Sequence, residues 1–224
     1  MRVATSRTHR TGSRPGPPPS LTVPAIAAAA VDLADAGGLD AVTMRSLAAA
    51  VGVSAPGLYR YVASRDELVG HMVDLVSGAL EHPAPSGDWV HDITLVAEQQ
   101  RAQFRAHPWL AEAVASLRFM GRHVLDHLDW GLAVLADVEA PPSRKMEAIA
   151  LANGVAALFS TASPPVGPEA FAQLDPVRHS RLAALLAGAA PGPPPGDLFP
   201  RVLEGVLRGV LEMPWSPTVA NLPG

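Results

Sequence analysis

The stretch from Thr43 to Val62 reads TMRSLAAAVGVSAPGLYRYV and contains the signals for two short helices and a tight turn between them. Thr43 can cap a helix over residues 44–51, and Ser54 can cap a second helix that runs to the end of the stretch. Between them, Gly52 provides the left-handed backbone conformation that a tight turn needs. Two short helices joined by a short turn with a glycine predict a helix-turn-helix over residues 43–62.

The apolar side chains of this stretch have the spacing needed to pack its two helices together, which leaves an outer surface for a partner. Small residues at the start of the second helix would let it enter the major groove of DNA. Its tyrosine hydroxyls and Arg60 can reach phosphates or base edges. The alternative is a plain helical hairpin with exposed tyrosines. The candidates for contact with double-stranded DNA, including two flanking arginines, are Arg45, Ser54, Ala55, Pro56, Gly57, Tyr59, Arg60, Tyr61 and Arg65.

Helices are also expected on both sides of this motif. Apolar residues recur at helical spacing from Leu21 until a pair of glycines, which favours a helix end there. Ser64 and Glu67 have the spacing of a capping box, which predicts a further helix after the motif. We therefore expect a DNA-binding domain of three helices, followed by this further helix, over residues 21–80.

The remainder of the chain is divided by proline-rich breaks into segments with helical periodicity and without a strand pattern. A break at residues 83–87 marks a domain boundary, so we expect a second helical domain over residues 88–213 and a tail over 214–224. The expected helices lie at residues 88–106, 109–117, 120–137, 143–160, 169–186 and 199–213, with loops at 163–168 and 188–196. For the helix at 169–186, the alternative is an interruption at Pro176. The whole fold is therefore predicted to be all-α.

Charge is distributed unevenly along the 224 residues, whose formal net charge is −4. Residues 1–65 carry seven arginines and three aspartates, a net charge of +4, which leaves −8 for the rest of the chain. Residues 1–20 contain almost no large apolar side chain, which predicts a disordered basic tail that is either solvated or in contact with DNA. The asymmetry indicates that only the amino-terminal part meets a polyanion.

Composition excludes several classes of protein. Because the chain has no cysteine, disulfides, cysteine-ligated zinc and thiol catalysis are ruled out, and a reducing compartment fits. We find no secretory signal and no run of about 18 apolar residues that would span a bilayer. We therefore expect a cytoplasmic protein without a membrane partner.

Residues 21–80, most sharply between Thr43 and Leu68, resemble the TetR family of bacterial regulators. The resemblance implies an all-helical homodimer in which a three-helix DNA-binding domain is joined to a larger ligand-binding and dimerisation domain. Residues 105–110 and 199–209 are similar to the subgroup of the tetracycline repressor, and no cofactor is implied. The resemblance also implies DNA contacts at Arg45, Ala55, Pro56, Gly57, Tyr59, Tyr61 and Arg65.

Aromatic residues, methionines and a few polar residues of the second domain are the best candidates to line a ligand cavity. Such cavities are mostly apolar and contain few polar anchors. The alternative for each of these residues is an ordinary core position. The candidates are Phe104, His107, Trp109, Leu117, Met120, His123, Trp130, Met146, Asn153 and Phe159.

His123 and His127 lie four residues apart, so they share one face of an expected helix and could hold a metal ion. The residues between them do not complete a His-Glu-x-x-His motif, and two partly exposed or pocket-lining histidines are the simpler alternative. We see no nucleophile, phosphate-binding loop or carboxylate pair in context. We therefore assign no catalytic residue and no metal ligand.

Small residues on the helix at residues 143–160, and Gly205 and Gly209 on the last helix, would allow helices to approach closely within one chain or in a dimer. A two-fold dimer is favoured because one short recognition helix reads little DNA. The sequence thus predicts a repressor that a small apolar effector releases from a palindromic operator. The alternatives are a helical protein that only binds a small molecule and a metal-dependent enzyme.

Overall fold

The computed structural model describes residues 21–161, 171–188 and 197–212, and every α-helical or 3-10 element in these ranges agrees with the predicted all-α fold, which is confirmed. The predicted tails at 1–20 and 214–224, the predicted loop at 163–168 and nearly all of the predicted loop at 188–196 lie outside the described residues. Within the described ranges, no helix is both long and apolar enough to cross a membrane.

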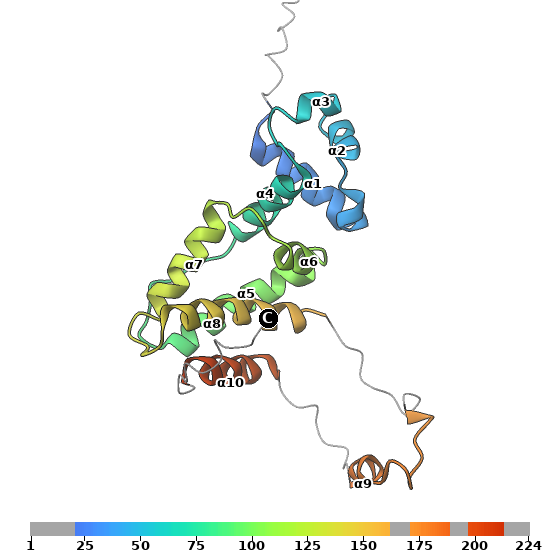
Figure 1. Ribbon diagram of the computed structural model, residues 1–224, viewed down its shortest axis with the longest axis vertical. Helices are drawn as coiled ribbons and strands as arrows, with labels where there is room; N and C mark the ends of the chain where they lie inside the picture. Colours follow the sequence, from blue (N-terminus) through green and yellow to red (C-terminus); the bar gives the residue numbers. More distant parts are fainter. Residues whose placement is uncertain (1–20, 162–170, 189–196, 213–224) are drawn as a thin grey trace, which may run out of the picture.

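Four α-helices and one short 3-10 helix form the amino-terminal end of the molecule (Figure 1). Thr22 begins the first helix by accepting a hydrogen bond from the amide of Ala25, and Gly38 ends it with a φ of 74°. A 3-10 turn, which we did not predict, then leads into the helix-turn-helix. The elements are α1 (Val23–Gly37), η1 (Leu39–Ala41), α2 (Met44–Ala50), α3 (Ala55–Leu58) and α4 (Arg65–Ser77).

Two local predictions at this end need correction. The α-helical part of the second motif helix ends at Leu58, earlier than predicted, and a turn follows in which the amides of Tyr61 and Val62 both donate to the carbonyl of Leu58. The capping box at α4 is also displaced: the side chain of Ser64 accepts from the Glu67 amide, but the Glu67 carboxylate accepts from Ala63 at 2.7 Å.

The remaining helices form the body of the molecule. In Figure 1, α5, α8 and α10 lie beside one another, α7 is inclined to them and meets them near one end, and α4 leads from the amino-terminal end into the body. No residue of α9 is buried, and it is drawn apart from the other helices. The elements are α5 (Trp89–Ala106), α6 (Leu110–Ala115), α7 (Arg122–Val134), α8 (Pro142–Leu158), α9 (Ser180–Gly188) and α10 (Phe199–Leu211).

Two predictions in the body are also wrong in detail. Residues 171–179 of the helix expected at 169–186 form turns, and the α-helix begins only at Ser180, after Pro176. The helix expected from residue 143 begins one residue earlier, at Pro142 of α8, because the fixed φ of proline suits a first helical turn.

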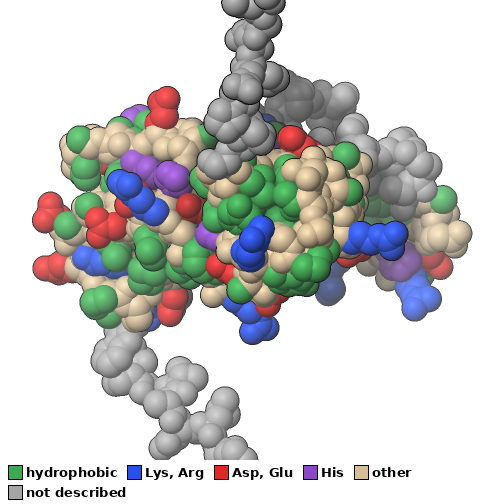
Figure 2. Space-filling model, turned by 90° about the horizontal axis from the view of Figure 1, so that it is seen from above, with side chains coloured by type: hydrophobic (Ala, Val, Ile, Leu, Met, Phe, Trp, Pro, Cys, Tyr) green, Lys and Arg blue, Asp and Glu red, His purple; other side chains and the backbone are tan. Residues whose placement is uncertain are grey.

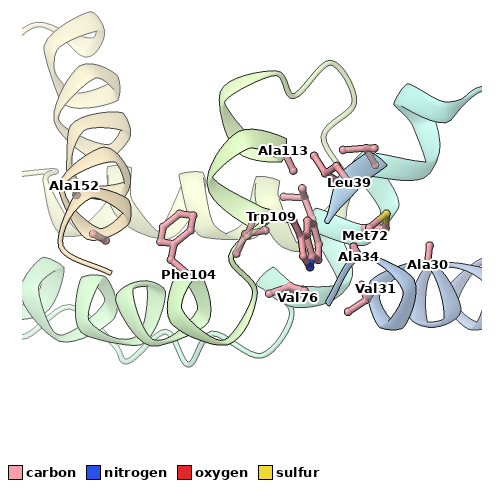
Figure 3. Close-up of a cluster of buried hydrophobic side chains, with 14 of the residues drawn as sticks. Ala30, Val31, Ala34, Leu39, Met72, Val76, Phe104, Trp109, Ala113 and Ala152 are labelled. Carbon is pink, nitrogen blue, oxygen red and sulfur yellow. The ribbon is translucent and has the colours of Figure 1, made fainter. Parts of the chain in front are cut away.

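One continuous apolar core connects the two ends of the chain, from Ile26 in α1 to Leu211 in α10. Trp109 is its most direct link, since its ring is 4% exposed and lies between α6 and the end of α1, where Ala34 is found (Figure 3). Its indole nitrogen donates to Asp35 of α1 over 2.6 Å. The amino-terminal domain is thus held to the body by packing and by a hydrogen bond.

Candidate functional site

The turn between α2 and α3 is built as the sequence predicts. Gly52 has a φ of 72°, and the amide of Val53 donates to the carbonyl of Ala48 over 3.0 Å. On the inner side, Leu47 and Leu58 are fully buried. The outer side therefore consists of short side chains on α3 and of the residues that follow it.

The residues after α3 form the most prominent part of this outer surface. Tyr59 is 52% exposed and Tyr61 is 37% exposed, and both stand in the turn that closes the motif. Arg60 is exposed and its Nε donates weakly to the carbonyl of Gly57 over 3.5 Å. Arg45, at the start of α2, is exposed as well. Figure 2 looks onto this end of the molecule, where Lys and Arg side chains stand singly among hydrophobic and other side chains.

The first residues of α3 are small for a structural reason. Ser54 caps the helix by accepting a hydrogen bond from the amide of Gly57 over 3.2 Å. A Cβ atom at Gly57 would lie 3.2 Å from the capping oxygen, so a larger residue there would disturb the cap. Pro56 is exposed, whereas Ala55 is partly buried against the core. Of the small candidates, Pro56 is therefore the most accessible.

Arg65 differs from the other candidates because much of its guanidinium is already used by the fold. Its Nε donates to the carbonyl of Val42 over 3.2 Å, and its Nη2 donates to the carbonyl of Leu39 over 2.8 Å. The side chain thereby ties η1 to the start of α4. We infer that Arg65 mainly holds the motif in its orientation, and that only its remaining hydrogen-bond donors are available to contact a partner.

A cavity of about 220 Å³ lies in the body, between α4, α5, α6, α7 and α8. Of the predicted lining residues, Phe104, Leu117, Met120 and Asn153 contribute to its wall. Most of the other lining side chains are aliphatic. The complete wall consists of Val73, Ser77, Leu80, Gln100, Gln103, Phe104, Leu110, Val114, Leu117, Met120, Val124, His127, Leu128, Ile149, Ala150 and Asn153.

Three predicted lining residues serve instead as links between elements. Trp109 and His107 both donate to Asp35 of α1, over 2.6 and 2.8 Å. The amide and ring nitrogens of His123 both donate to Asp74 of α4, over 2.7 and 3.1 Å. Their polar atoms are engaged at junctions rather than directed into the cavity.

The other three predicted lining residues also lie outside the wall of the cavity. The indole nitrogen of Trp130 donates to the carbonyl of Pro83 over 2.7 Å. Phe159 packs against Phe199 of α10, with ring centroids 5.7 Å apart. Met146 is exposed on α8. Residue type alone did not separate cavity positions from core and surface positions.

Apart from Asn153, most of the polar part of the cavity wall was not among the predicted residues. It includes Ser77 of α4, Gln100 and Gln103 of α5 and His127 of α7. The one available signal was the spacing of the two glutamines, which lie three residues apart on the helical face that also holds Phe104. His127 lines the cavity, which agrees with the alternative stated for the histidine pair and not with a metal ligand.

His127 joins two other residues in a chain of hydrogen bonds. Its Nδ1 lies 3.0 Å from Nε2 of His82, and its Nε2 lies 3.1 Å from Nε2 of Gln100. Burial, with a smaller effect from His82, lowers the pKa of His127 to about 4. Burial also lowers the pKa of His82, against the opposing effect of Asp126. Both rings are therefore neutral at physiological pH.

The paired histidines are not arranged as a metal site. His123 contacts Asp74, while His127 contacts His82 and Gln100. Among the residues that the structure describes, no group of three or more His, Cys, Asp or Glu side chains is placed to hold a metal ion.

The segment that leads into α7 connects the cavity to α4. Gly121 has no side chain to cap α7, and the carboxylate of Asp74 instead accepts hydrogen bonds from the amides of His123 and Val124. Phe119 presses against Gly70 of α4, where a Cβ atom would collide with it. Val124 also lines the cavity, so one residue contacts both the cavity and, through Asp74, α4.

Comparison with known families gives two matches that together cover most of the chain. Residues 20–72 match the family described as bacterial regulatory proteins, tetR family. Residues 82–213 match the tetracyclin repressor-like C-terminal domain.

Two curated relatives are also similar to this chain. The HTH-type transcriptional repressor DrrR1 of Streptomyces coeruleorubidus is 35% identical over 148 residues, which are 64% of this chain and 55% of that protein. An HTH-type transcriptional regulator of Saccharopolyspora erythraea is 32% identical over 119 residues, which are 53% of this chain and 50% of that protein. The chain thus spans about half the length of the curated relatives it matches.

Among solved structures, the Streptomyces coelicolor TetR family protein ActR in complex with (S)-DNPA has a similar fold. The TM-score is 0.68 at 25% sequence identity, and the alignment covers 86% of this chain and 98% of that one.

Proposed function

Because the chain belongs to the tetR family of bacterial regulatory proteins, we propose that it is a DNA-binding transcriptional repressor that a small molecule releases from its operator. One observation carries this proposal: a helix-turn-helix with an exposed outer surface is joined through one continuous core to a domain with an internal cavity. The family assignment favours a regulator over the metal-dependent enzyme considered above. A repressor acts on the chromosome, so the proposal places the protein in the cytoplasm.

The DNA contacts of this proposal come from the outer side of α2 and α3. The two exposed tyrosines donate hydroxyl hydrogen bonds to phosphates, which fix the position of the motif on the duplex. Ala55 and Gly57 have no side-chain donors, so recognition of bases rests on Arg60 and Arg45. Arg65 assists mainly by holding η1 and α4 together.

A homodimer would present two such motifs to a palindromic operator. The outer faces of α8 and α10 support this, because they combine glycines, which have no side chain, with several exposed apolar residues. Beyond Gly154, Gly205 and Gly209 there is open space for a neighbouring helix. The buried Ala148, Ala152 and Ala156, in contrast, pack inside the chain. The exposed apolar residues beside the glycines are Leu151, Leu158, Leu198 and Val202.

The cavity would hold the effector of this chain; ActR, which has a similar fold, was solved in complex with (S)-DNPA. An effector changes DNA affinity only if it binds one conformation more tightly than the other. The contacts of Asp74 and Phe119 provide the physical link, since both join α4 to the segment beside the cavity. A ligand that displaces this segment would reorient α4 and with it the helix-turn-helix.

The proposal is tested by electrophoretic mobility shift with fragments from upstream of the gene that encodes the chain. We expect binding to one palindromic site that resists nonspecific competitor DNA and weakens as salt is raised. Candidate effectors added to the complex should release the DNA. A failure to bind any such site selectively, with folded protein, would contradict the proposed function.

A further inference from the structure

The arrangement of polar atoms around the cavity determines which way each hydrogen bond runs. Nε2 of Gln100 is a donor only, so Nε2 of His127 must accept from it. The proton of the neutral His127 ring is then on Nδ1, which donates to Nε2 of His82. The chain of hydrogen bonds thus runs outward, from the cavity wall through α7 to the residue between α4 and α5.

Because the side-chain nitrogen of Gln100 donates to His127, the side-chain oxygen of Gln100 remains available as an acceptor. The same is true of Gln103, because its Nε2 donates to the carbonyl of Val76 over 2.8 Å. Within the described residues, no donor contacts the side-chain oxygen of either glutamine. The two residues both line the cavity and lie three positions apart on the same face of α5, so their side chains are neighbours in the wall.

The rest of the wall carries no charge. It includes no Lys, Arg, Asp or Glu, and its other polar groups are the hydroxyl of Ser77, the amide of Asn153 and the neutral ring of His127. An anionic ligand would lose its hydration and find no cation, while facing two carbonyl oxygens. A neutral molecule with an apolar body would instead bury its surface against Phe104 and Met120.

We infer that the cavity takes a neutral, mostly apolar ligand that carries adjacent hydroxyl or phenol groups, which donate to the side-chain oxygens of Gln100 and Gln103. This inference rests on the proposed role of the cavity as the effector site and specifies the chemistry of that effector. His82 and His127 act as positioning residues, because they hold the amide nitrogen of Gln100 and so direct its oxygen.

Isothermal titration calorimetry with three naphthalenes tests this inference on the full chain. Naphthalene-2,3-diol carries two adjacent donors, its dimethyl ether has the same ring system without donors, and 2-naphthoate is anionic. We expect the dissociation constant of the diol to be at least about tenfold lower than that of either other compound. A tenfold difference corresponds to the free energy that one good hydrogen bond contributes to binding. Equal or tighter binding of the ether or the naphthoate, or no binding of the diol, would overturn the inference.

Two matched variants show whether the glutamines are responsible. Gln103→Leu should remove most of the preference for the diol over its ether. Gln99→Leu makes the same change one turn away, where the amide contacts the backbone of Glu81, and should keep that preference. An equal preference in both variants would count against the assignment, and thermal denaturation verifies that each is folded.

The same preparations are examined for DNA binding, which separates this inference from the proposed function. Selective binding of the diol without recognition of any operator would refute the repressor and leave the ligand chemistry standing. Operator binding combined with an absent preference for the diol would refute the ligand chemistry alone.

Discussion

At the scale of single residues, the arginines near the helix-turn-helix differ in how many of their hydrogen-bond donors the fold already uses. Two nitrogens of the Arg65 guanidinium donate hydrogen bonds to the carbonyls of Leu39 and Val42, so this side chain stabilises the conformation of the motif. Arg45 and Arg60 are exposed and keep nearly all their donors for a partner. The same residue type therefore contributes to folding in one position and to recognition in another.

Tyr61 is the residue at which we expect the clearest loss of DNA binding. Its ring is exposed directly after the motif, so Tyr61→Ala should weaken operator binding by about 1–3 kcal/mol if it contacts a phosphate or base. Tyr61→Phe removes only the hydroxyl and should account for part of this loss. The mobility shift of Arg122→Ala, a change on an exposed residue of α7, serves as the control. Unaltered affinity in Tyr61→Ala would remove this residue from the interface.

His127 should make the stability of the protein dependent on pH. Its pKa is lowered in the folded state from 6.5 to about 4, so between these values the unfolded chain binds more protons than the folded one. The free energy of unfolding should therefore fall as the pH decreases from about 6.5 towards 4. Urea denaturation at several pH values measures this, with His127→Asn expected to show a shallower decrease. Identical profiles for wild type and His127→Asn would disprove the assignment.

At the scale of elements, hydrogen bonds at helix ends decide where helices begin. Thr43 and Ser46 form a reciprocal capping box that starts α2. The start of α7 has no such local device, and its amides are satisfied by Asp74 from α4. A cap supplied by another helix has two effects. It provides an acceptor for the first amides of the helix, which have no partner within the helix, and it fixes the distance between the two helices.

Removal of that cap should be measurable. Asp74→Ala leaves the amides of His123 and Val124 without an acceptor and should lower the free energy of unfolding by about 0.5–2 kcal/mol. Asp74→Asn keeps one oxygen and should cost less. Chemical denaturation checks both, and Asp126→Ala on the exposed side of α7 is the comparison. A loss no greater in Asp74→Ala than in Asp126→Ala would show that the cap is unimportant.

At the scale of the whole molecule, the described residues form two exposed surfaces that could contact a partner, one at each end. The helix-turn-helix presents exposed tyrosines and arginines, and the paired helices α8 and α10 present exposed apolar residues. Between them, the core and the contacts of Asp35 and Asp74 connect the two regions. This layout suits a protein in which assembly, ligand and DNA influence one another.

Leu158 provides the test of the assembly. It is 71% exposed on the outer face of α8, so Leu158→Glu should place a charge in the proposed dimer interface and yield monomers in light-scattering chromatography. Operator affinity should fall with it, because each monomer reads only half of a palindrome. Leu125→Glu, at an exposed position of α7, should remain dimeric. If both variants elute like the wild type, the interface lies elsewhere.

The sequence by itself determined the helix-turn-helix, because its signals are local. The capping residues Thr43 and Ser54, the turn glycine and the apolar spacing all lie within twenty residues, where backbone geometry relates each position to the next. Most helices of the body were also predicted within a few residues of their ends, since proline and helical periodicity act over the same short range. The exception at Ser180 arose where turns replaced an expected helix.

Only the tertiary structure decided what surrounds the cavity. Gln100, His127 and His82 come from three separate segments, and periodicity shows which face of a helix is buried but not which partner it meets. For the same reason, Trp109 was predicted at the cavity and lies at a junction with Asp35 instead. Contacts between distant segments depend on how whole helices pack, and a local pattern of residues does not contain that information.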